Sequence, residues 1–301
     1  MGASCLFLLL LILNAAKSEN KICQNSSSDR SCSHVGSLKG MLSFIRSVTH
    51  SLGELVETAK HKVDVIEDGF CGNQQTNSTA SKDEWCLKAE QDCYGLHSTG
   101  LRKSGIYRIW PKFLNHSVHV YCDMEKDDGG WTVIQRRGDY GDRPRSFYET
   151  WDNYKNGFGD LNQDFWLGND IIFALTNQVD MTLRIDLEDF EGQKRFAIYR
   201  NFIVRSEREK YRMTFEGYEG DAGDSLKVHN GKIFITKDNG GGCAVNFKGG
   251  WWYSECHEVN LNGIYHRGYH ETYADGINWF AFRGYNHSMK HAQMKIRPCG
   301  C

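Results

Sequence analysis

The chain has 301 residues, of which 40% are hydrophobic and 25% are charged, and its formal net charge is -2. This composition excludes a mostly disordered chain, and the near-neutral charge excludes the basic footprint of a general nucleic-acid binder. It also gives no reason to expect a membrane-surface partner. At this length we expect one large domain with an accessory segment, or two domains.

The first residues predict secretion. An apolar run from Cys5 to Leu13 is followed by small residues up to Ser18. This pattern is typical of a secretory signal peptide over 1–18. The run is too short to span a bilayer, which needs about 20 residues. We therefore expect an extracellular protein without a membrane-inserted segment.

The cysteines agree with secretion. Ten of the eleven lie beyond the predicted signal, and an even number in a secreted chain indicates disulfides. Structural zinc is the alternative, but the chain has no Cys-x-x-Cys pair to favour it. Four sequons predict N-linked glycans at surface positions, and they are Asn25, Asn77, Asn115 and Asn286.

Residues 33–70 carry a heptad pattern. Steps of alternating three and four residues from Val35 to Phe70 meet ten apolar residues at eleven positions. Two arrangements are open, a coiled coil that makes homo-oligomers and an amphipathic helix packed on its own domain. We favour the coiled coil because Cys32 and Cys71 bracket the repeat, where interchain disulfides would join parallel helices. A polar stretch over 71–85 then predicts a linker.

The rest of the chain has the pattern of an α+β domain with no internal repeat. Short strands are predicted at 118–121, 131–134 and 181–187, where β-branched and aromatic residues recur. Short helices are predicted at 206–211 and within 163–175, and glycine-rich turns separate these segments.

Several motifs of this domain resemble the fibrinogen-related domain, the C-terminal module of fibrinogen chains, ficolins, tachylectins, tenascins and angiopoietins. The resemblance implies a fibrinogen C-terminal-like globular domain at 86–301, with a twisted antiparallel sheet and short helices, preceded by an N-terminal helical coiled coil. The motifs occur in order and are Ser104-Gly105-Ile106-Tyr107, Val120-Tyr121-Cys122-Asp123-Met124, Asp128-Gly129-Gly130-Trp131, Phe165-Trp166-Leu167-Gly168-Asn169, Gly250-Trp251-Trp252-Tyr253, Cys256-His257, Asn260-Leu261-Asn262-Gly263 and Ile296-Arg297-Pro298.

The resemblance also implies two disulfides, Cys93–Cys122 and Cys243–Cys256. Domain termini often lie close together, so Cys86 is expected to meet Cys299 or Cys301. Three cysteines then remain for the stalk, namely Cys23, Cys32 and Cys71.

Lectins of this family bind an N-acetylated sugar near the C-terminal end, where its acetyl group enters an aromatic pocket. Aromatic rings can enclose the acetyl methyl group, a small side chain leaves room for it, and backbone N–H groups hold the carbonyl oxygen. The peptide bond before the second cysteine of this region is often cis in the family. The residues at the pocket positions are Phe247, Cys256, His257, Tyr273, Ala274 and Tyr285.

Two features depart from this pattern. The family often has tyrosine where this chain has Phe247, so one hydroxyl is missing. The family's calcium loop usually carries several aspartates, whereas residues 236–243 contain Asp238 as their sole acid. Calcium needs 6–8 oxygen ligands, so we expect no calcium site of the family type and no other cofactor. Asp238 is at most a weak ligand.

Some of these residues, and two further histidines, can also be explained by structural roles without a ligand or a metal. The aromatic residues of 250–253 are expected to be core, and His257 without the resemblance would be a structural histidine. His287 and His291 are four residues apart and could share a helical face as metal ligands, but no third ligand accompanies them. We expect two exposed histidines instead.

The chain has no motif of a serine hydrolase, a zinc protease or a phosphate-binding loop, so we expect no enzyme. The first hypothesis is a secreted oligomeric lectin that recognises N-acetylated carbohydrates on microbial or cell surfaces, in innate immune recognition or agglutination. Its stalk would raise avidity by clustering several weak sites. The alternative is a secreted ligand that binds a receptor or matrix protein through the same domain. A clotting role is third, because no protease-cleaved knob sequence is evident.

Overall fold

The computed structural model describes residues 90–141 and 144–299, so the predicted signal peptide, coiled coil and linker lie outside the described residues. Within the described part no helix is long and apolar enough to cross a membrane. The elements in chain order are α4 (Cys93–Ser98), β1 (Gly105–Ile109), β2 (Val118–Asp123), a 3-10 turn (Lys126–Asp128), β3 (Trp131–Arg137), α5 (Trp151–Asn156), β4 (Phe158–Gly159), β5 (Phe165–Trp166), α6 (Asn169–Gln178), β6 (Met181–Glu188), β7 (Lys194–Val204), a 3-10 turn (Glu207–Glu209), β8 (Met213–Gly220), a 3-10 turn (Lys227–His229), α7 (Cys243–Asn246), β9 (Val259–Asn260), β10 (Asn278–Trp279), α8 (Phe280–Arg283) and β11 (His291–Pro298).

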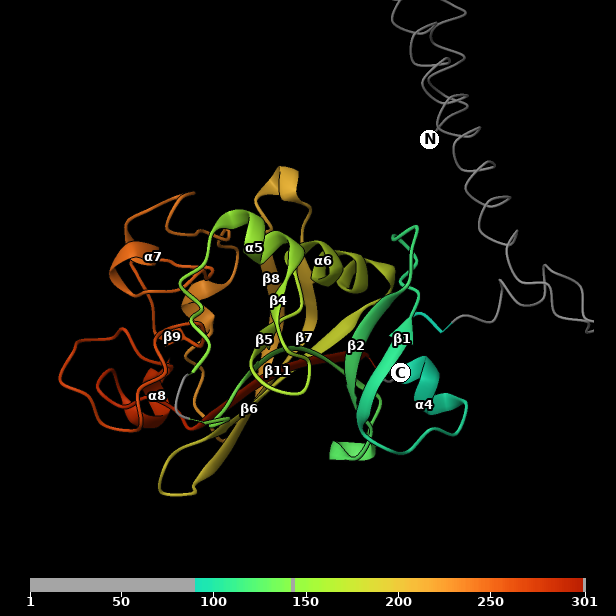
Figure 1. Ribbon diagram of the computed structural model, residues 1–301, viewed down its shortest axis with the longest axis horizontal. Helices are drawn as coiled ribbons and strands as arrows, with labels where there is room; N and C mark the ends of the chain where they lie inside the picture. Colours follow the sequence, from blue (N-terminus) through green and yellow to red (C-terminus); the bar gives the residue numbers. More distant parts are fainter. Residues whose placement is uncertain (1–89, 142–143, 300–301) are drawn as a thin grey trace, which may run out of the picture. The chain divides into compact units, whose positions relative to one another are not determined.

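One antiparallel sheet organises this domain (Figure 1). Its strand order is β1-β2-β3-β11-β6-β7-β8, and the short β5 pairs with both β3 and β4. The last strand, β11, lies between β3 and β6, so the C-terminal segment occupies the middle of the sheet. The strands predicted at 118–121, 131–134 and 181–187 are confirmed as β2, β3 and β6.

The helix predicted within 163–175 is wrong in its first part. Phe165 and Trp166 form β5, which pairs with β3 through Trp166 opposite Gln135. Both rings are buried. Gly168 has φ 111°, and α6 begins only at Asn169. The burial of two aromatic rings against a distant strand outweighs the local helical pattern.

The helix predicted over 206–211 is also shorter than expected. A 3-10 turn covers Glu207–Glu209, and the next two residues, Lys210 and Tyr211, have φ of 52° and 47°. Left-handed backbone at two successive residues ends any right-handed helix. Tyr211 turns into the core and is fully buried.

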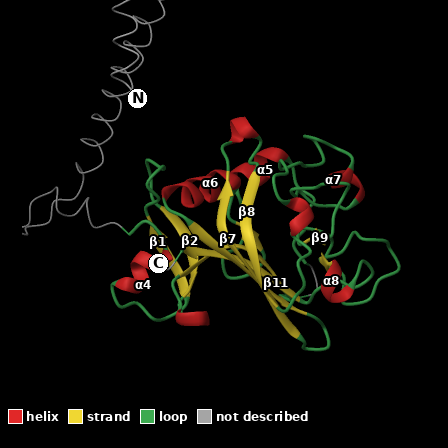
Figure 2. Ribbon diagram, turned by 180° about the vertical axis from the view of Figure 1, so that it is seen from behind, coloured by secondary structure: helices red, strands yellow, loops and turns green. Residues whose placement is uncertain are grey.

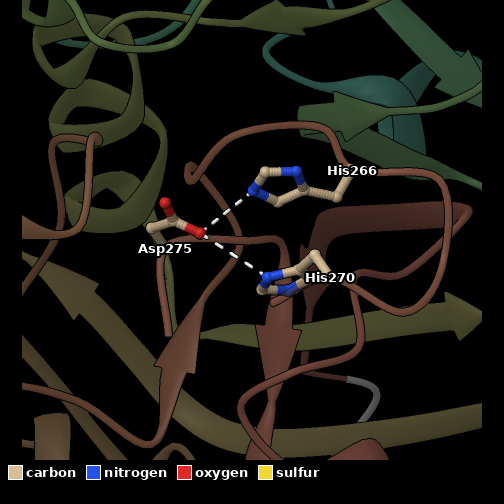
Figure 3. A group of neighbouring side chains, drawn as sticks. All are labelled: His266, His270 and Asp275. Carbon is tan, nitrogen blue, oxygen red and sulfur yellow. Dashed lines mark hydrogen bonds and ion pairs between the residues drawn. The ribbon is translucent and has the colours of Figure 1, made fainter. Parts of the chain in front are cut away.

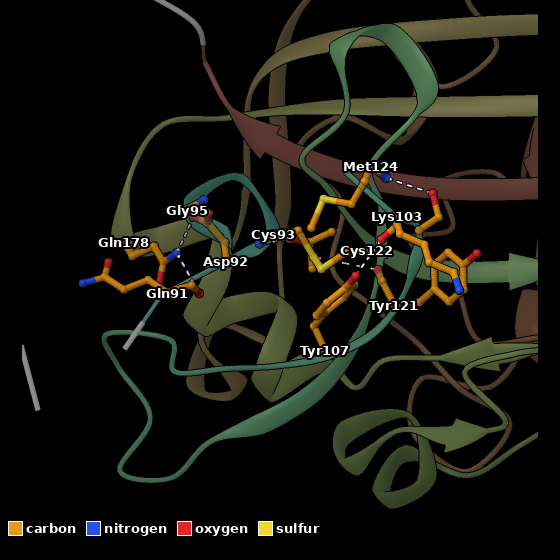
Figure 4. The surroundings of a disulfide bond; sticks show 12 residues. Gln91, Asp92, Cys93, Gly95, Lys103, Tyr107, Tyr121, Cys122, Met124 and Gln178 are labelled. Carbon is orange, nitrogen blue, oxygen red and sulfur yellow. Dashed lines mark hydrogen bonds between the residues drawn. A yellow bond between two sulfur atoms is a disulfide. The ribbon is translucent and has the colours of Figure 1, made fainter. Parts of the chain in front are cut away.

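The first disulfide joins α4 to β2 (Figure 4). Cys93 and Cys122 are both buried, with their Cα atoms 5.5 Å apart. Asp92 caps α4, because its Oδ1 accepts the N–H of Gly95 at 2.9 Å. Gln178 of α6 donates to the other carboxylate oxygen at 3.1 Å. The first element of the domain is therefore tied both to the sheet and to α6.

The second implied disulfide, Cys243–Cys256, is also formed. Cys299 carries a free thiol, and its sulfur lies 3.3 Å from the hydroxyl of Thr182. The expected pairing of Cys86 with Cys299 or Cys301 involves Cys86, which lies outside the described residues.

The segment between β8 and β11 contains only short regular elements and gathers at one end of the sheet, in orange and red in Figure 1. Strand β3 anchors it. Gln135 donates to the carbonyl of Leu261 at 3.1 Å, and Nη1 of Arg137 donates to the carbonyls of Leu261 at 3.1 Å and Gly263 at 2.9 Å. Burial lowers the pKa of Arg137 to about 10, so its guanidinium stays charged at neutral pH. It stacks on Phe147 at 3.8 Å.

Arg137→Met should destabilise the domain. It leaves the carbonyl of Gly263 without this buried donor and removes one of the two donors to the carbonyl of Leu261. An unpaired buried group costs about 1–3 kcal/mol. We expect the free energy of unfolding to fall by about 3 kcal/mol, measured by urea unfolding under non-reducing conditions. Arg200→Met, at an exposed position of β7, is the control and should change it by less than about 0.5 kcal/mol. An unchanged midpoint for Arg137→Met would contradict this role.

Candidate functional site

The residues predicted for the pocket come from three segments that the structure brings together. The Cys243–Cys256 disulfide joins α7 to the loop before β9. It places Phe247, at the end of α7, beside His257 with the ring centroids 4.5 Å apart and the planes perpendicular. The third segment runs from Tyr273 to Tyr285, and its contacts with His257 complete the cluster.

His257 stands at the centre of this cluster. Its Nε2 lies 2.9 Å from the carbonyl oxygen of Ala274. A carbonyl can only accept, so Nε2 carries the proton and Nδ1 has a free lone pair. Nδ1 is buried and has no partner among the described residues. Burial lowers the pKa of His257 to about 4, so the imidazole is neutral at physiological pH.

Tyr285 closes the cluster from the other side. Its hydroxyl donates to the carbonyl of His257 at 3.0 Å, and its own carbonyl accepts the N–H of Ala274 at 3.2 Å. Its ring lies 5.7 Å from the His257 ring and 5.3 Å from the Tyr273 ring. Tyr273 is 66% exposed, whereas Ala274 is 2% exposed. The site therefore combines a buried small residue with a solvent-facing aromatic ring.

The backbone at Cys256 supplies unused donors. The Glu255–Cys256 peptide bond is cis, as the resemblance implies. Within the described part of the chain, the N–H groups of Cys256 and His257 donate to no protein acceptor. Both amides therefore keep hydrogen-bonding capacity for a ligand or for water beside the aromatic rings.

Two side chains that hold this backbone in place were not assigned a role from the sequence. Asn260 is fully buried, and its Nδ2 donates to the carbonyls of Phe247 at 3.0 Å and Gly276 at 3.1 Å. His229 bonds the carbonyl of Trp252 at 2.8 Å through Nδ1 and accepts the N–H of Val259 at 3.1 Å through Nε2. The motif containing Asn260 is visible in the sequence, but its partners lie 13 and 16 residues away in irregular segments.

Asp238 has a clear hydrogen-bonding role. Its Oδ1 accepts the N–H of Trp151 at 3.0 Å and the hydroxyl of Thr236 at 2.7 Å. The carboxylate thereby ties the short 236–243 loop to the start of α5. This interaction needs no bound cation.

The prediction of two exposed histidines at 287 and 291 is wrong. Both are half-buried. His287 lies in an irregular segment with Nε2 3.5 Å from Glu191, and His291 begins β11 with its ring 6.4 Å from that of Tyr140. They share no helical face, because no helix forms there. By contrast, the prediction that Trp251 and Trp252 are core is confirmed, since both are fully buried.

The family described as "Fibrinogen beta and gamma chains, C-terminal globular domain" matches residues 89–299. The chain belongs to this family. Members are non-enzymatic lectins and ligand proteins, so the fibrinogen C-terminal domain described above is a binding module and not an enzyme.

Two relatives with similar sequences are named Techylectin-5A and Ryncolin-4. The chain is 52% identical to Techylectin-5A of Tachypleus tridentatus over 214 residues, which cover 69% of this chain and 73% of that protein. It is 49% identical to Ryncolin-4 of Cerberus rynchops over 220 residues, covering 71% and 63%.

Solved structures agree on the fold. The fibrinogen-like globe domain of human ANGPTL2 matches with a TM-score of 0.67 and 42% identity, covering 70% of this chain and all of that one. Lamprey fibrin D-dimer, complexed with the peptide Gly-His-Arg-Pro-amide, matches with a TM-score of 0.67 and 30% identity, covering 90% and 94%.

The buried histidines predict that stability falls in acid. Burial lowers the pKa of His257 to about 4 and that of His229 to about 3, whereas an unfolded imidazole titrates near about 6.5. Below that pH the unfolded chain binds more protons than the folded one, so the free energy of unfolding decreases as the pH falls. The histidine contribution is expected to be complete above about pH 6.5 and to be lost progressively down to about pH 3.

Urea midpoints measured across this pH window test the prediction. His257→Gln removes one of these contributions and should flatten the dependence, while His119→Gln, at an exposed position of β2, should leave it unchanged. An identical slope for His257→Gln and the native chain would show that His257 is protonated without cost in the folded state.

The two described sequons should differ in occupancy. Asn115 is exposed, whereas Nδ2 of Asn286 donates to the carbonyls of His270 at 3.2 Å and Thr272 at 3.1 Å. A glycan attaches at this nitrogen and replaces one of its two hydrogens, so at most one of the two bonds could remain. We expect glycopeptide mass spectrometry of the secreted protein to find a glycan at Asn115 and none at Asn286. An occupied Asn286 would contradict the prediction.

Proposed function

We propose that this protein is a secreted, oligomeric lectin that binds N-acetylated carbohydrates through the cluster of Phe247, His257, Tyr273 and Tyr285. The observation that carries the proposal is the meeting of these rings around buried Ala274, beside two backbone N–H groups without protein acceptors. An acetamide has a methyl group, a carbonyl oxygen and an N–H, and this arrangement offers a partner for each.

Each part of the acetamide has a stated partner in this proposal. The aromatic rings enclose the methyl group above Ala274, which removes apolar surface from water. The N–H groups of Cys256 and His257 donate to the carbonyl oxygen. The hydroxyl of Tyr273, on a largely exposed side chain, is available to the acetamide N–H or to the sugar ring. The neutral state of His257 fits an uncharged ligand.

The 52% identity to a relative named as a techylectin supports a lectin. A single site of this kind would bind weakly, and the proposed coiled coil over 33–70 would bring several sites together. Joining several heads can raise avidity by about 10²–10⁴ without new contacts. We propose recognition of microbial or cell surfaces, with agglutination or innate immune recognition as the outcome.

A second candidate is a protein ligand that docks a receptor or matrix protein with the same end of the domain. It is favoured by the 42% identity to the globe domain of human ANGPTL2 and by the exposed aromatic residues Tyr269, Tyr273 and Phe280. Exposed tyrosine and phenylalanine are enriched at protein interfaces.

Retention on an acetylated resin tests the lectin proposal, with free N-acetylglucosamine and glucosamine as competitors. We expect only N-acetylglucosamine to elute the protein. Tyr273→Ala should weaken binding by about tenfold, which is the effect expected for one contact residue worth about 1.4 kcal/mol. Tyr269→Ala is the matched control. It removes a 73% exposed tyrosine that makes no ring contact with the pocket residues in the described structure.

Three results would count against the lectin. Equal elution by glucosamine would remove the acetyl specificity, and equal loss in both tyrosine variants would indicate a general aromatic surface. No retention of folded protein would favour the receptor-ligand alternative.

A further inference from the structure

A second group of polar side chains lies close in sequence to Tyr273 and Ala274 of the proposed pocket (Figure 3). None of the contacts described above involves these side chains. It consists of His266, His270 and Asp275. Across the described residues this is the one group of three or more His, Cys, Asp or Glu side chains whose donor atoms all lie within 4.8 Å of one another. Figure 3 shows both imidazoles directed at the same carboxylate oxygen.

The spacing of the donor atoms suits a transition metal. Oδ1 of Asp275 lies 3.0 Å from Nε2 of His266 and 3.7 Å from Nδ1 of His270. The two rings stack with their centroids 4.2 Å apart and their planes 19° from parallel. Ligands about 2.0–2.1 Å from a tetrahedral zinc ion stand about 3.3 Å apart. The two measured distances fall on either side of that value, so small side-chain rotations would admit the ion.

The surroundings also meet the needs of a metal site. The hydroxyl of Thr272 lies 2.7 Å from Oδ1 of Asp275 and orients this ligand as an outer group, whereas its contact with Nδ1 of His270 at 3.0 Å would be replaced by the ion. The side chains of His270 and Asp275 are 6% and 13% exposed, whereas that of His266 is 24% exposed. The ion would therefore enter from the His266 side.

We propose that His266, His270 and Asp275 bind one Zn²⁺ ion per chain, with solvent completing the coordination. Two imidazole nitrogens with one carboxylate suit zinc, whereas calcium and magnesium prefer sites made entirely of oxygen ligands. The arrangement is distinct from the calcium loop expected of the family, because it uses none of the residues 236–243.

A zinc ion at this position would order the segment that carries two residues of the proposed pocket. The ligands bracket the segment that carries Tyr273 and Ala274, and Asp275 follows Ala274 directly. An ion held by His266 and Asp275 closes this segment into a short ring. This consequence rests on the proposed lectin function: zinc and an acetylated sugar should strengthen the binding of each other, because both favour the same ordered loop.

Equilibrium dialysis of the secreted, full-length protein against Zn²⁺, after chelator treatment and removal of the chelator, tests the site. The decisive comparison is with His266→Gln, which removes the most exposed ligand and keeps a side-chain donor for Asp275. His119→Gln, on the exposed face of β2, controls for the loss of a histidine elsewhere. We expect the native chain and His119→Gln to bind one zinc more than His266→Gln, or to bind it at least about tenfold more tightly.

Co²⁺ substitution gives an independent readout, because visible absorption bands typical of four- or five-coordinate cobalt should appear in the native chain and be lost in His266→Gln. Asp275→Asn should lose them too, and His266→Gln decides the matter if Asp275→Asn does not fold. Equal zinc uptake by the native chain and His266→Gln would overturn the site, as would no uptake by the folded native chain.

The coupling is tested by acetyl-resin retention of the same samples with and without zinc. Retention that zinc does not change would overturn the coupling. Zinc binding lost in His266→Gln, in a protein that the resin never retains, would support the metal site and reject the lectin function.

Discussion

Buried polar side chains hold together the part of this domain that carries the site. The segment between β8 and β11 has too few strands to pair its own peptide groups, and unpaired buried peptide groups are costly. Gln135 and Arg137, on the interior strand β3, donate to the carbonyls of Leu261 and Gly263. Asn260 donates to the carbonyl of Phe247, and His229 accepts the N–H of Val259, so these side chains also bond peptide groups of this segment. Side chains of the sheet thus fix the position of a segment that has little regular secondary structure.

This constraint explains how the residues of the proposed pocket are held in place although most of them lie outside helices and strands. Phe247 is placed by the disulfide to Cys256 and by the hydrogen bond from Asn260 to its carbonyl. Ala274 is held between Nε2 of His257 and the carbonyl of Tyr285. Side chains fixed from several directions lose little entropy when a ligand arrives, which helps a small ligand to bind.

The fold by itself does not choose the function. The same fold carries a relative named as a techylectin and a globe domain of an angiopoietin-like protein, so function depends on the lining of the site. Here the lining is uncharged and aromatic around His257, while the charged group of His266, His270 and Asp275 lies in the adjoining loop. The proposed acetyl pocket and the proposed zinc site meet in this loop, so under both proposals the loop is where ligand binding would be regulated.

The sequence by itself determined the domain family, the strands β2, β3 and β6 and both disulfides, and it supplied the residues of the proposed pocket. These follow from local alternation and from motifs that keep their order. Only the tertiary structure decided that Phe165 and Trp166 form a strand, because their partner Gln135 is distant in the chain. It alone joined Asn260 to Phe247 and His266 to Asp275. Such pairings occur in irregular loops, where no periodicity marks which side chains meet, and burial then selects the contacts.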